Sequence, residues 1–379
     1  MLRKRNLTVV LLITLVAFIV FYVRPLSSSH APIALTPANS TLGFGTIIAV
    51  SHAKSPRRAS LLWAANLTDL EIVIPEQTQW TEAELEDFRS KEHSVVSRGS
   101  ALAWLGHLDA LRWFLSTPHS TALILEDDTD FSLHIRRTQI PLLASSIRAL
   151  LGNTSSSPGP NDPDYWAPTE EWDLLYPGHC DDLPSPERYL SHPHLTYPDP
   201  STPPHHLLHP DTSHFLSTLN VPAHTRILHR AFWPFCTFAY GVNRRSTAKI
   251  LAEFWKEKDG AVSAFDVQLL ESCRDQRWKC WSVSPEVFHH GVWGSEIAHA
   301  EEVGGRLEEG IRPTVPERGT WNIQCGARGP GVWVSEEDGE LREEVKAVVR
   351  GMIERGECPV DGRERGWRGC EYGECGAQS

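Results

Sequence analysis

The segment 121–125, Thr-Ala-Leu-Ile-Leu, is a short apolar run that ends directly at a cluster of carboxylates. Four acidic side chains follow it within five positions, namely Glu126, Asp127, Asp128 and Asp130. Such a run predicts a strand buried on both faces, and strands of that kind belong to sheets that carry helices on both sides. Carboxylates this close repel one another unless a cation or a polar ligand lies among them. The pattern therefore predicts a ligand site at the carboxyl edge of an α/β sheet, where ligands bind in open sheets.

Strand-like and helix-like segments alternate along the rest of the chain. Runs of apolar and β-branched residues predict strands at 46–50, 71–75, 172–176 and 235–242. Apolar residues at helical spacing predict helices at 56–65, 100–115, 248–255 and 341–352. The last helix is expected to carry Leu341, Val345, Val348 and Met352 on one face. This alternation indicates an α/β fold in which helices cover both faces of a sheet.

The acidic cluster offers only oxygen ligands. All-oxygen ligation suits Mn²⁺ or Mg²⁺, and either ion can also bridge the phosphates of a substrate. The alternative is a capped, solvated acidic turn without a ligand. The fully apolar run that precedes the cluster favours a site, because it places these carboxylates at the end of a buried strand.

Residues 7–23 form an unbroken apolar segment without charge or proline. Three basic residues precede it at positions 3–5, and only Arg24 follows closely. This asymmetry predicts a cytosolic N-terminus and a lumenal remainder. A cleaved signal peptide is the alternative, but its apolar stretch usually spans ~7–15 residues and ends at small residues. Because the run is longer and Arg24-Pro25 follows it, we expect one uncleaved signal-anchor in the endoplasmic reticulum or Golgi membrane.

The composition and the absent motifs exclude several functions. The net charge of −12 argues against a nucleic-acid partner, whose phosphates an acidic protein repels. Hydrophobic residues make up 41% of the chain, which predicts a buried core rather than disorder. The sequence contains no P-loop, no G-x-G-x-x-G and no H-E-x-x-H motif, so kinase, dehydrogenase and zincin functions have no support.

All eight cysteines follow the apolar segment, in the part of the chain where an oxidising lumen lets disulfides persist. The sequence does not fix their pairing. For Cys273 and Cys280, however, the short polar segment between them predicts a surface turn that brings the two close together, where they can be bridged. Acceptor tripeptides for N-glycosylation begin at Asn39, Asn66 and Asn153 and agree with lumenal exposure.

The expected organisation has five parts: a cytosolic tail at 1–6, the anchor at 7–23, a stem at 24–44, a folded domain at 45–300 and a charged region at 301–379. Within the folded domain, segment 158–222 holds many of the 27 prolines and is expected to be a mostly irregular insertion around the strand 172–176. Its histidines are open to two interpretations, scattered surface residues or a metal site: His192, His194, His205, His206, His209 and His214.

Several segments in the same order resemble glycosyltransferase family 25, the group of lipooligosaccharide and procollagen β-galactosyltransferases. The acidic motif Leu125-Glu126-Asp127-Asp128 is the closest of them. The others are Ile48-Ala49-Val50 with Ser55-Pro56-Arg57-Arg58, the helix from Gly99 to His107, Trp172-Asp173-Leu174-Leu175, Ala239-Tyr240-Gly241-Val242 and Phe265-Asp266. Together they sample roughly residues 46–298. The resemblance implies a GT-A-like fold, a nucleotide-sugar donor such as a UDP-hexose, a divalent metal with Mn²⁺ favoured over Mg²⁺, and inversion at the anomeric carbon.

The resemblance also implies roles for single residues. Asp127 and Asp128 would hold the metal, while Glu126 would contact the donor's ribose or support the ligands. Arg57 or Arg58 would meet the nucleotide, with a surface salt bridge as the alternative. Asp130 lies beyond the matched motif and is expected to matter less.

Three further residues are candidates with alternatives. Asp266 is the candidate general base, and a helix-capping aspartate is the other interpretation. His289, or its neighbour His290, is a candidate late metal ligand. His107 is expected to be structural.

The predicted function is therefore metal-dependent transfer of a sugar, with galactose favoured, to a hydroxyl of a glycan or glycoprotein acceptor. One alternative is a metal-dependent phosphoesterase or other hydrolase, although the closely spaced His and Asp pairs of two-metal enzymes are scarce. The other is an inactive lumenal binding protein with the same fold. Retention of all three acidic residues at 126–128 disfavours that alternative.

Overall fold

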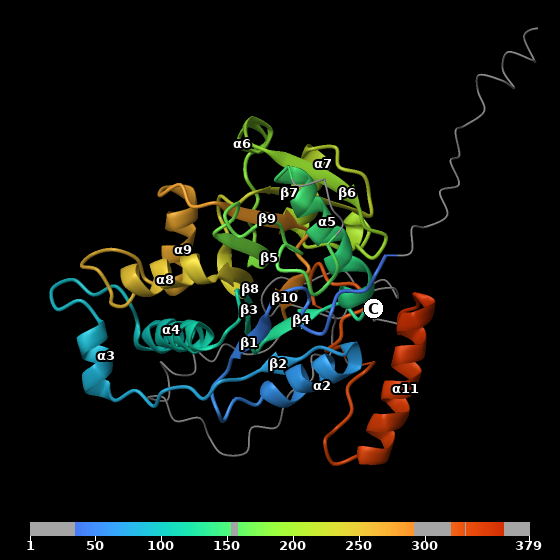
Figure 1. Cartoon of the computed structure of the whole chain (residues 1–379), viewed down its shortest axis with the longest axis horizontal. Coiled ribbons are helices and arrows are strands. Elements are labelled where there is room, and N and C mark those ends of the chain that lie inside the picture. The colour runs from blue at the N-terminus through green and yellow to red at the C-terminus, as the bar shows by residue number, and fades with distance from the viewer. Residues whose placement is uncertain (1–34, 153–157, 292–319, 330, 360–379) are drawn as a thin grey trace, which may run out of the picture. The chain divides into compact units, whose positions relative to one another are not determined.

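The computed structural model describes residues 35–152, 158–291, 320–329 and 331–359 (Figure 1). The chain separates into two units, Met1–Leu35 and Thr36–Ser379, and the described residues belong almost wholly to the second. The expected anchor at 7–23 lies outside the described residues. Among those that are described, no helix is long and apolar enough to cross a membrane.

A 10-stranded mixed sheet organises the fold, with the main order β2-β1-β3-β8-β5-β9-β7-β6. Strand β1 pairs in parallel with β2 and β3, whereas β8 runs antiparallel to both β3 and β5. Short strand β10 joins β4 to β5. The strands are β1 Thr46–Val50, β2 Ile72–Val73, β3 Thr121–Glu126, β4 Thr129–Phe131, β5 Leu174–Cys180, β6 His194–Pro198, β7 Thr225–Arg230, β8 Phe235–Asn243, β9 Cys280–Ser284 and β10 Phe288–His290.

The predicted helices form close to their expected positions, and sequence-local caps start several of them. Thr81 makes a capping box with Glu84, and Asn243 makes one with Ser246. The α-helices are α2 Arg58–Thr68, α3 Glu82–Phe88, α4 Arg98–Ser116, α5 Ile140–Leu150, α6 Pro186–Ser191, α7 Pro210–Thr218, α8 Arg244–Glu253, α9 Phe265–Arg274 and α11 Gly339–Arg355; a π-turn at Ile135–Gln139 precedes α5, and a 3₁₀ turn occupies His205–Leu207.

Helices cover both faces of the sheet, which confirms the expected α/β class. Side chains of the central strands alternate between two cores, as the period of a strand requires. In β3, Leu123 and Leu125 face the core shared with α2, α5 and α11, whereas Ala122 and Ile124 face the core shared with α4, α8 and α9. Figure 1 shows α4, α8 and α9 on one side of the central strands and α2 with α11 on the other.

Segment 158–222 contains more regular structure than the single strand that the sequence predicted. Besides β5, this segment contains α6, β6 and α7, and its apolar residues form a third core with Ile227 of β7. The prolines are compatible with this order because of where they stand. Pro186 and Pro210 occupy the first turns of their helices, where a missing backbone N–H costs nothing, and Pro198 ends an edge strand.

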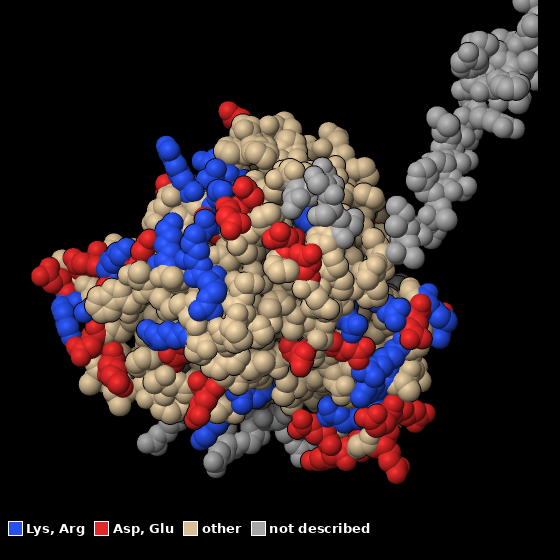
Figure 2. Space-filling view, in the orientation of Figure 1, with Lys and Arg blue, Asp and Glu red and all other residues tan. Residues whose placement is uncertain are grey.

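The late helix is confirmed as α11, and the four apolar residues of its predicted face differ in burial, since Val345 packs against the core. Leu341 and Val348 are 46% and 58% exposed, whereas Val349 and Ile353 are buried. Helical spacing is also satisfied by the stripe at 345, 349 and 353, so the sequence could not choose between adjacent faces. Figure 2 shows acidic and basic side chains interspersed over the part of the surface that α11 occupies in Figure 1.

Three disulfides join described cysteines. Cys273–Cys280 confirms that those two residues lie together. The others are Cys180–Cys236, between β5 and β8, and Cys325–Cys358. Described residues between 325 and 353, which the sequence assigns to a separate charged region, pack into the core that also contains α2.

Candidate functional site

The acidic turn, residues 126–130, lies where the order of the parallel strands reverses. The chain leaves β1 to form β2 on one side and later returns to form β3 on the other side. Helices at such a switch point diverge, and ligands of open α/β sheets bind beyond the carboxyl ends of the two central strands. Ser51 directly follows β1, and Glu126 ends β3. The fold therefore brings the turn before α2 and the acidic turn to one edge.

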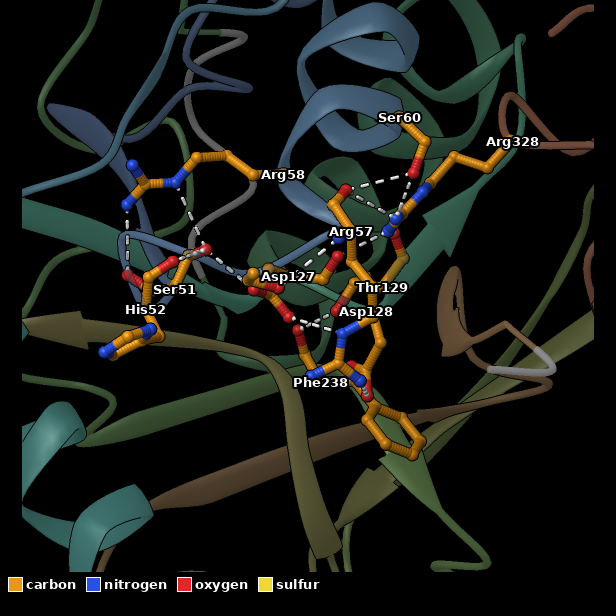
Figure 3. Close-up of polar contacts among 11 residues, drawn as sticks. Ser51, His52, Arg57, Arg58, Ser60, Asp127, Asp128, Thr129, Phe238 and Arg328 are labelled. Carbon is orange, nitrogen blue, oxygen red and sulfur yellow. Dashed lines mark hydrogen bonds and ion pairs between the residues drawn. The ribbon is translucent and has the colours of Figure 1, made fainter. Parts of the chain in front are cut away.

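Arg57 contacts both predicted metal ligands (Figure 3). Its Nε lies 3.0 Å from Asp127 Oδ1, and its Nη1 lies 2.9 Å from Asp128 Oδ2. Ser51 Oγ donates a hydrogen bond of 2.7 Å to the other oxygen of Asp127. Arg58 turns away from the carboxylates, since its Nη2 donates to the carbonyl oxygen of Ser51 at 3.1 Å. Of the two predicted arginines, only Arg57 pairs with the acidic turn.

Asp128 keeps one oxygen without a partner. Within the described residues, its Oδ1 is buried and accepts no hydrogen bond. Burial raises the pKa of Asp128 to about 7, because the neighbouring charges of Glu126 and Asp127 add to the effect and outweigh the attraction of Arg57. The positive charges of Arg57 and Arg328 therefore do not offset the combined effect of burial and the neighbouring carboxylates on Asp128.

Arg328 fixes the backbone of the acidic turn, although sequence analysis gave no sign of it. The side chain is buried, and its Nη1 donates 2.7 Å hydrogen bonds to the carbonyl oxygens of Asp127 and Thr129. Its Nη2 donates to the carbonyl oxygen of Arg57 at 3.0 Å and to Ser60 Oγ at 2.6 Å. Burial lowers the pKa of Arg328 to about 10. This one guanidinium therefore joins the acidic turn to the start of α2.

Asp130 is a structural residue rather than a peripheral one. Only 1% exposed, it accepts hydrogen bonds from Thr320 Oγ1 at 2.7 Å and from the backbone N–H of Arg328 at 3.0 Å. Burial raises its pKa despite these contacts. Asp130 therefore anchors the segment that carries Arg328, and the expectation that it matters less than Asp128 stays a prediction.

Glu126 points away from Asp127 and Asp128 toward α4 and β8. Its Oε1 accepts a short hydrogen bond from Thr237 Oγ1 and lies 3.5 Å from His107 Nε2. Burial alone would raise the pKa of Glu126, but the hydrogen bonds from His107 and Thr237 lower it. Its side chain is 29% exposed at the sheet edge.

Asp266 stands in the first turn of α9, near the same edge. Its Oδ2 accepts a 3.0 Å hydrogen bond from the backbone N–H of Cys236, and its Oδ1 accepts one from Val267 at 2.8 Å. Burial raises its pKa, and the charge of Glu126 contributes to the rise. Asp266 is not the N-cap of α9, which is Ala264, but its carboxylate binds one backbone N–H of the first helical turn and lies within electrostatic reach of Glu126.

His289 of β10 contacts Glu286, which lies just before the same strand. Its Nδ1 lies 2.6 Å from Glu286 Oε1. Burial alone would raise the pKa of Glu286, but His289 holds it at about 2. His290 instead lies within electrostatic reach of Glu126, and its pKa falls to about 4 through burial and the charge of His289. The backbone N–H of Gly291 bonds to the carbonyl oxygen of Asp128 at 2.9 Å, which holds β10 against the acidic turn.

The predicted metal ligands do not form a ready-made cluster. In the described part of the chain, sets of three ligand atoms within 4.8 Å of one another occur elsewhere: His134 with Cys325 and Cys358, Glu92 with His93 and Asp259, and Asp181 with His209 and Asp211. The first contains a disulfide, and the last is the only one with a histidine from segment 158–222.

Comparison with known proteins finds no matching family model and no matching curated protein.

Proposed function

We propose that this chain is a metal-dependent hexosyltransferase. It would transfer a sugar, with galactose favoured, from a UDP-hexose to a hydroxyl of a glycan or glycoprotein acceptor, with inversion. One observation carries the proposal: Asp128 presents a buried carboxylate oxygen without a partner among the described residues, at the edge of the sheet where ligands bind. The resemblance to glycosyltransferase family 25 and its GT-A-like fold points in the same direction and remains part of the proposal.

The residues of the acidic turn fit a divalent cation in part. Asp128 Oδ1 has no hydrogen-bond partner among the described residues, and Mn²⁺ or Mg²⁺ accepts hard oxygen ligands of this kind. Asp127 is a weaker candidate ligand, because Ser51 and Arg57 occupy its two oxygens. His289 would have to leave Glu286 to offer its Nδ1. We therefore assign the ion first to Asp128, with Asp127 as the second ligand once Arg57 moves.

Each side chain then has a chemical task. When bound, the metal would neutralise the diphosphate leaving group as a Lewis acid. Arg57, released from the aspartates, would pair with a phosphate oxygen, which suits its planar donors. Asp266 would accept the proton of the acceptor hydroxyl as that oxygen attacks the anomeric carbon. The bond from this carbon to the diphosphate oxygen breaks on the opposite face, and the configuration inverts.

The raised pKa of Asp266 suits a base, since a more basic carboxylate takes a proton more readily. Its two backbone contacts leave lone pairs on both oxygens, because a carboxylate has about four acceptor positions.

The proposed location is the lumenal side of the endoplasmic reticulum or Golgi membrane, in a single-pass type II arrangement.

One observation favours a second candidate, an inactive lumenal binding protein with the same fold. Arg57 already pairs with both Asp127 and Asp128, and this partly compensates their charge without a metal. A protein that uses Arg57 permanently in this way would bind a ligand at this edge without transferring a sugar.

A donor screen separates the two candidates. Purified full-length protein would be incubated with individual nucleotide-sugars, with Mn²⁺ or with EDTA, and release of the nucleoside diphosphate would be measured. The proposed function predicts turnover of one UDP-hexose that requires the metal and rises with a glycan acceptor. Ligand binding without turnover of any donor would support the inactive protein, and release of inorganic phosphate from a phosphoester without an acceptor would support a hydrolase.

A further inference from the structure

Glu126 is held at only one of its two carboxylate oxygens. Thr237 Oγ1 donates to Oε1, and His107 Nε2 lies 3.5 Å from the same atom. No described residue donates a hydrogen bond to Oε2. Because the side chain is 29% exposed at the sheet edge, one oxygen is anchored by protein and the other is open to a ligand.

The anchor is a chain of hydrogen bonds with a single consistent direction. Thr237 gives its proton to Glu126, so its oxygen must accept from His107 Nε2, which lies 3.2 Å away. His107 then carries a proton on Nε2, and its Nδ1 lies within hydrogen-bond distance of Tyr240 Oη, at 3.1 Å. These contacts fix the orientation of the ring.

Packing holds the same ring in place. His107 lies in α4 and is only 3% exposed, and its ring stacks on Phe265 with centroids 4.8 Å apart and planes 9° apart. Tyr240 of β8 is fully buried. His107 therefore cannot reach a ligand itself, and any effect it has on one must pass through Thr237 and Glu126.

We infer that His107 is a positioning residue, which acts through Thr237 to aim the free oxygen of Glu126 at the vicinal hydroxyls of a nucleotide's ribose. An acidic side chain at the carboxyl edge of an α/β sheet bonds ribose hydroxyls in other nucleotide sites. A carboxylate fixed on one side pays less ordering entropy when it binds such a diol. The inference rests on the proposed function, because it takes the ligand to be a nucleotide-sugar.

Binding of two nucleotides to matched variants tests this inference. UDP and 2′-deoxy-UDP would be titrated calorimetrically into the full-length protein with Mn²⁺ present. The natural protein is expected to bind UDP about tenfold more tightly, since a hydrogen bond to a charged group is lost with the 2′-hydroxyl. His107→Phe keeps a ring that can stack on Phe265 but removes the hydrogen-bond donor. The ratio of the two dissociation constants, 2′-deoxy-UDP over UDP, should therefore fall to nearly one. His107→Gln supplies an amide N–H near the place of Nε2 and should restore the ratio.

Thermal unfolding of each variant identifies a purely structural effect. If His107→Phe fails to fold, Thr237→Val breaks the same link from β8 and should abolish the ratio in the same way. A ratio unchanged in His107→Phe or Thr237→Val would overturn the inference, as would a His107→Gln protein that loses both the ratio and its stability. Failure of the natural protein to bind either nucleotide would instead contradict the proposed function, and the inference would fall with it.

Discussion

Arg57 and Arg328 contact the acidic turn in different ways. Arg57 pairs with carboxylate oxygens of Asp127 and Asp128, and the proposed metal would replace Arg57 at these oxygens. Arg328 instead donates to backbone carbonyl oxygens, including those of Asp127 and Thr129, and is itself buried. The first arginine is therefore suited to exchange partners during binding, and the second holds the turn in shape throughout.

Replacing Arg328 with Met should destabilise the protein strongly. The change leaves several buried carbonyl oxygens and the carboxylate of Asp130 without their cationic neighbour, and breaking such a buried contact costs about 3–5 kcal/mol. Denaturant unfolding would measure the loss in the free energy of unfolding. Arg112→Met is the control, because Arg112 is 46% exposed, and its change should stay within about 0.5 kcal/mol. Equal effects of the two substitutions would argue against a central role for Arg328.

Part of the site could be read from the sequence, and part could not. Glu126, Asp127 and Asp128 stand out because they follow a buried strand without interruption. Arg328 has no such local signal, since it belongs to a segment without periodicity and reaches the turn only through tertiary packing. The partners of His289 were hidden for the same reason, because Glu286 precedes a strand too short to predict.

At the scale of elements, the central strands and the helices that flank them were predictable because local apolar patterns determine them. The elements around the third core were not, since their prolines look like loop residues until a helix start or a strand edge explains them. One buried pair shows what these elements contribute to the sheet. The side chains of Arg226 in β7 and of Asp199, which follows β6, are both inaccessible to solvent. Arg226 Nε lies 2.6 Å from Asp199 Oδ2.

Asp199→Asn should weaken folding in a pH-dependent manner. Burial alone would raise the pKa of Asp199, but Arg226 lowers it below the ordinary value. A carboxyl with a depressed folded-state pKa stabilises the fold above its unfolded pKa of about 3.9, and this contribution is lost as the pH falls. The variant should therefore lose about 3–5 kcal/mol at pH 7, and the gap to the natural protein should narrow below pH 4.

Urea unfolding of both proteins at pH 7 and pH 3 would measure this gap. Asp87→Asn provides the baseline, because Asp87 is 79% exposed in a surface ion pair. A gap of the same size at both pH values would show that the charge of Asp199 contributes nothing to stability.

Gly178 of β5 permits β10 to approach the sheet. A Cβ at this position would lie 2.8 Å from Phe288 Cβ and 2.9 Å from the carbonyl oxygen of Phe288. Gly178→Ala should therefore displace β10, lower stability by about 1–3 kcal/mol and reduce any nucleotide binding. Gly339→Ala is the matched control, since nothing lies within 4 Å of its added Cβ. Normal stability of Gly178→Ala, measured by thermal unfolding, would mean that the backbone can shift without cost.

At the scale of the whole molecule, the anchor predicted at 7–23 would place the proposed site in the lumen. N-terminal sequencing of the mature protein should find this segment retained, and the rest of the chain should resist added protease in intact microsomes. Asn66 is exposed on α2, so a glycosidase should lower the apparent mass if its acceptor tripeptide is used. A mature chain that begins after Ser27 or Ser29 would contradict the anchor, and cleavage in intact microsomes would contradict the topology.

The central claim is that Asp128 holds a metal for sugar transfer. Its most direct test is the Mn²⁺ dependence of donor turnover by Asp128→Asn, compared with the natural protein and with Asp87→Asn. We predict that turnover falls by about 10²–10³-fold and that its dependence on Mn²⁺ weakens, because one preorganised charge is gone. The melting temperature without metal should stay the same or rise slightly, since repulsion within the acidic turn is relieved. Turnover by Asp128→Asn at nearly the natural rate, with ordinary Mn²⁺ dependence, would contradict the account.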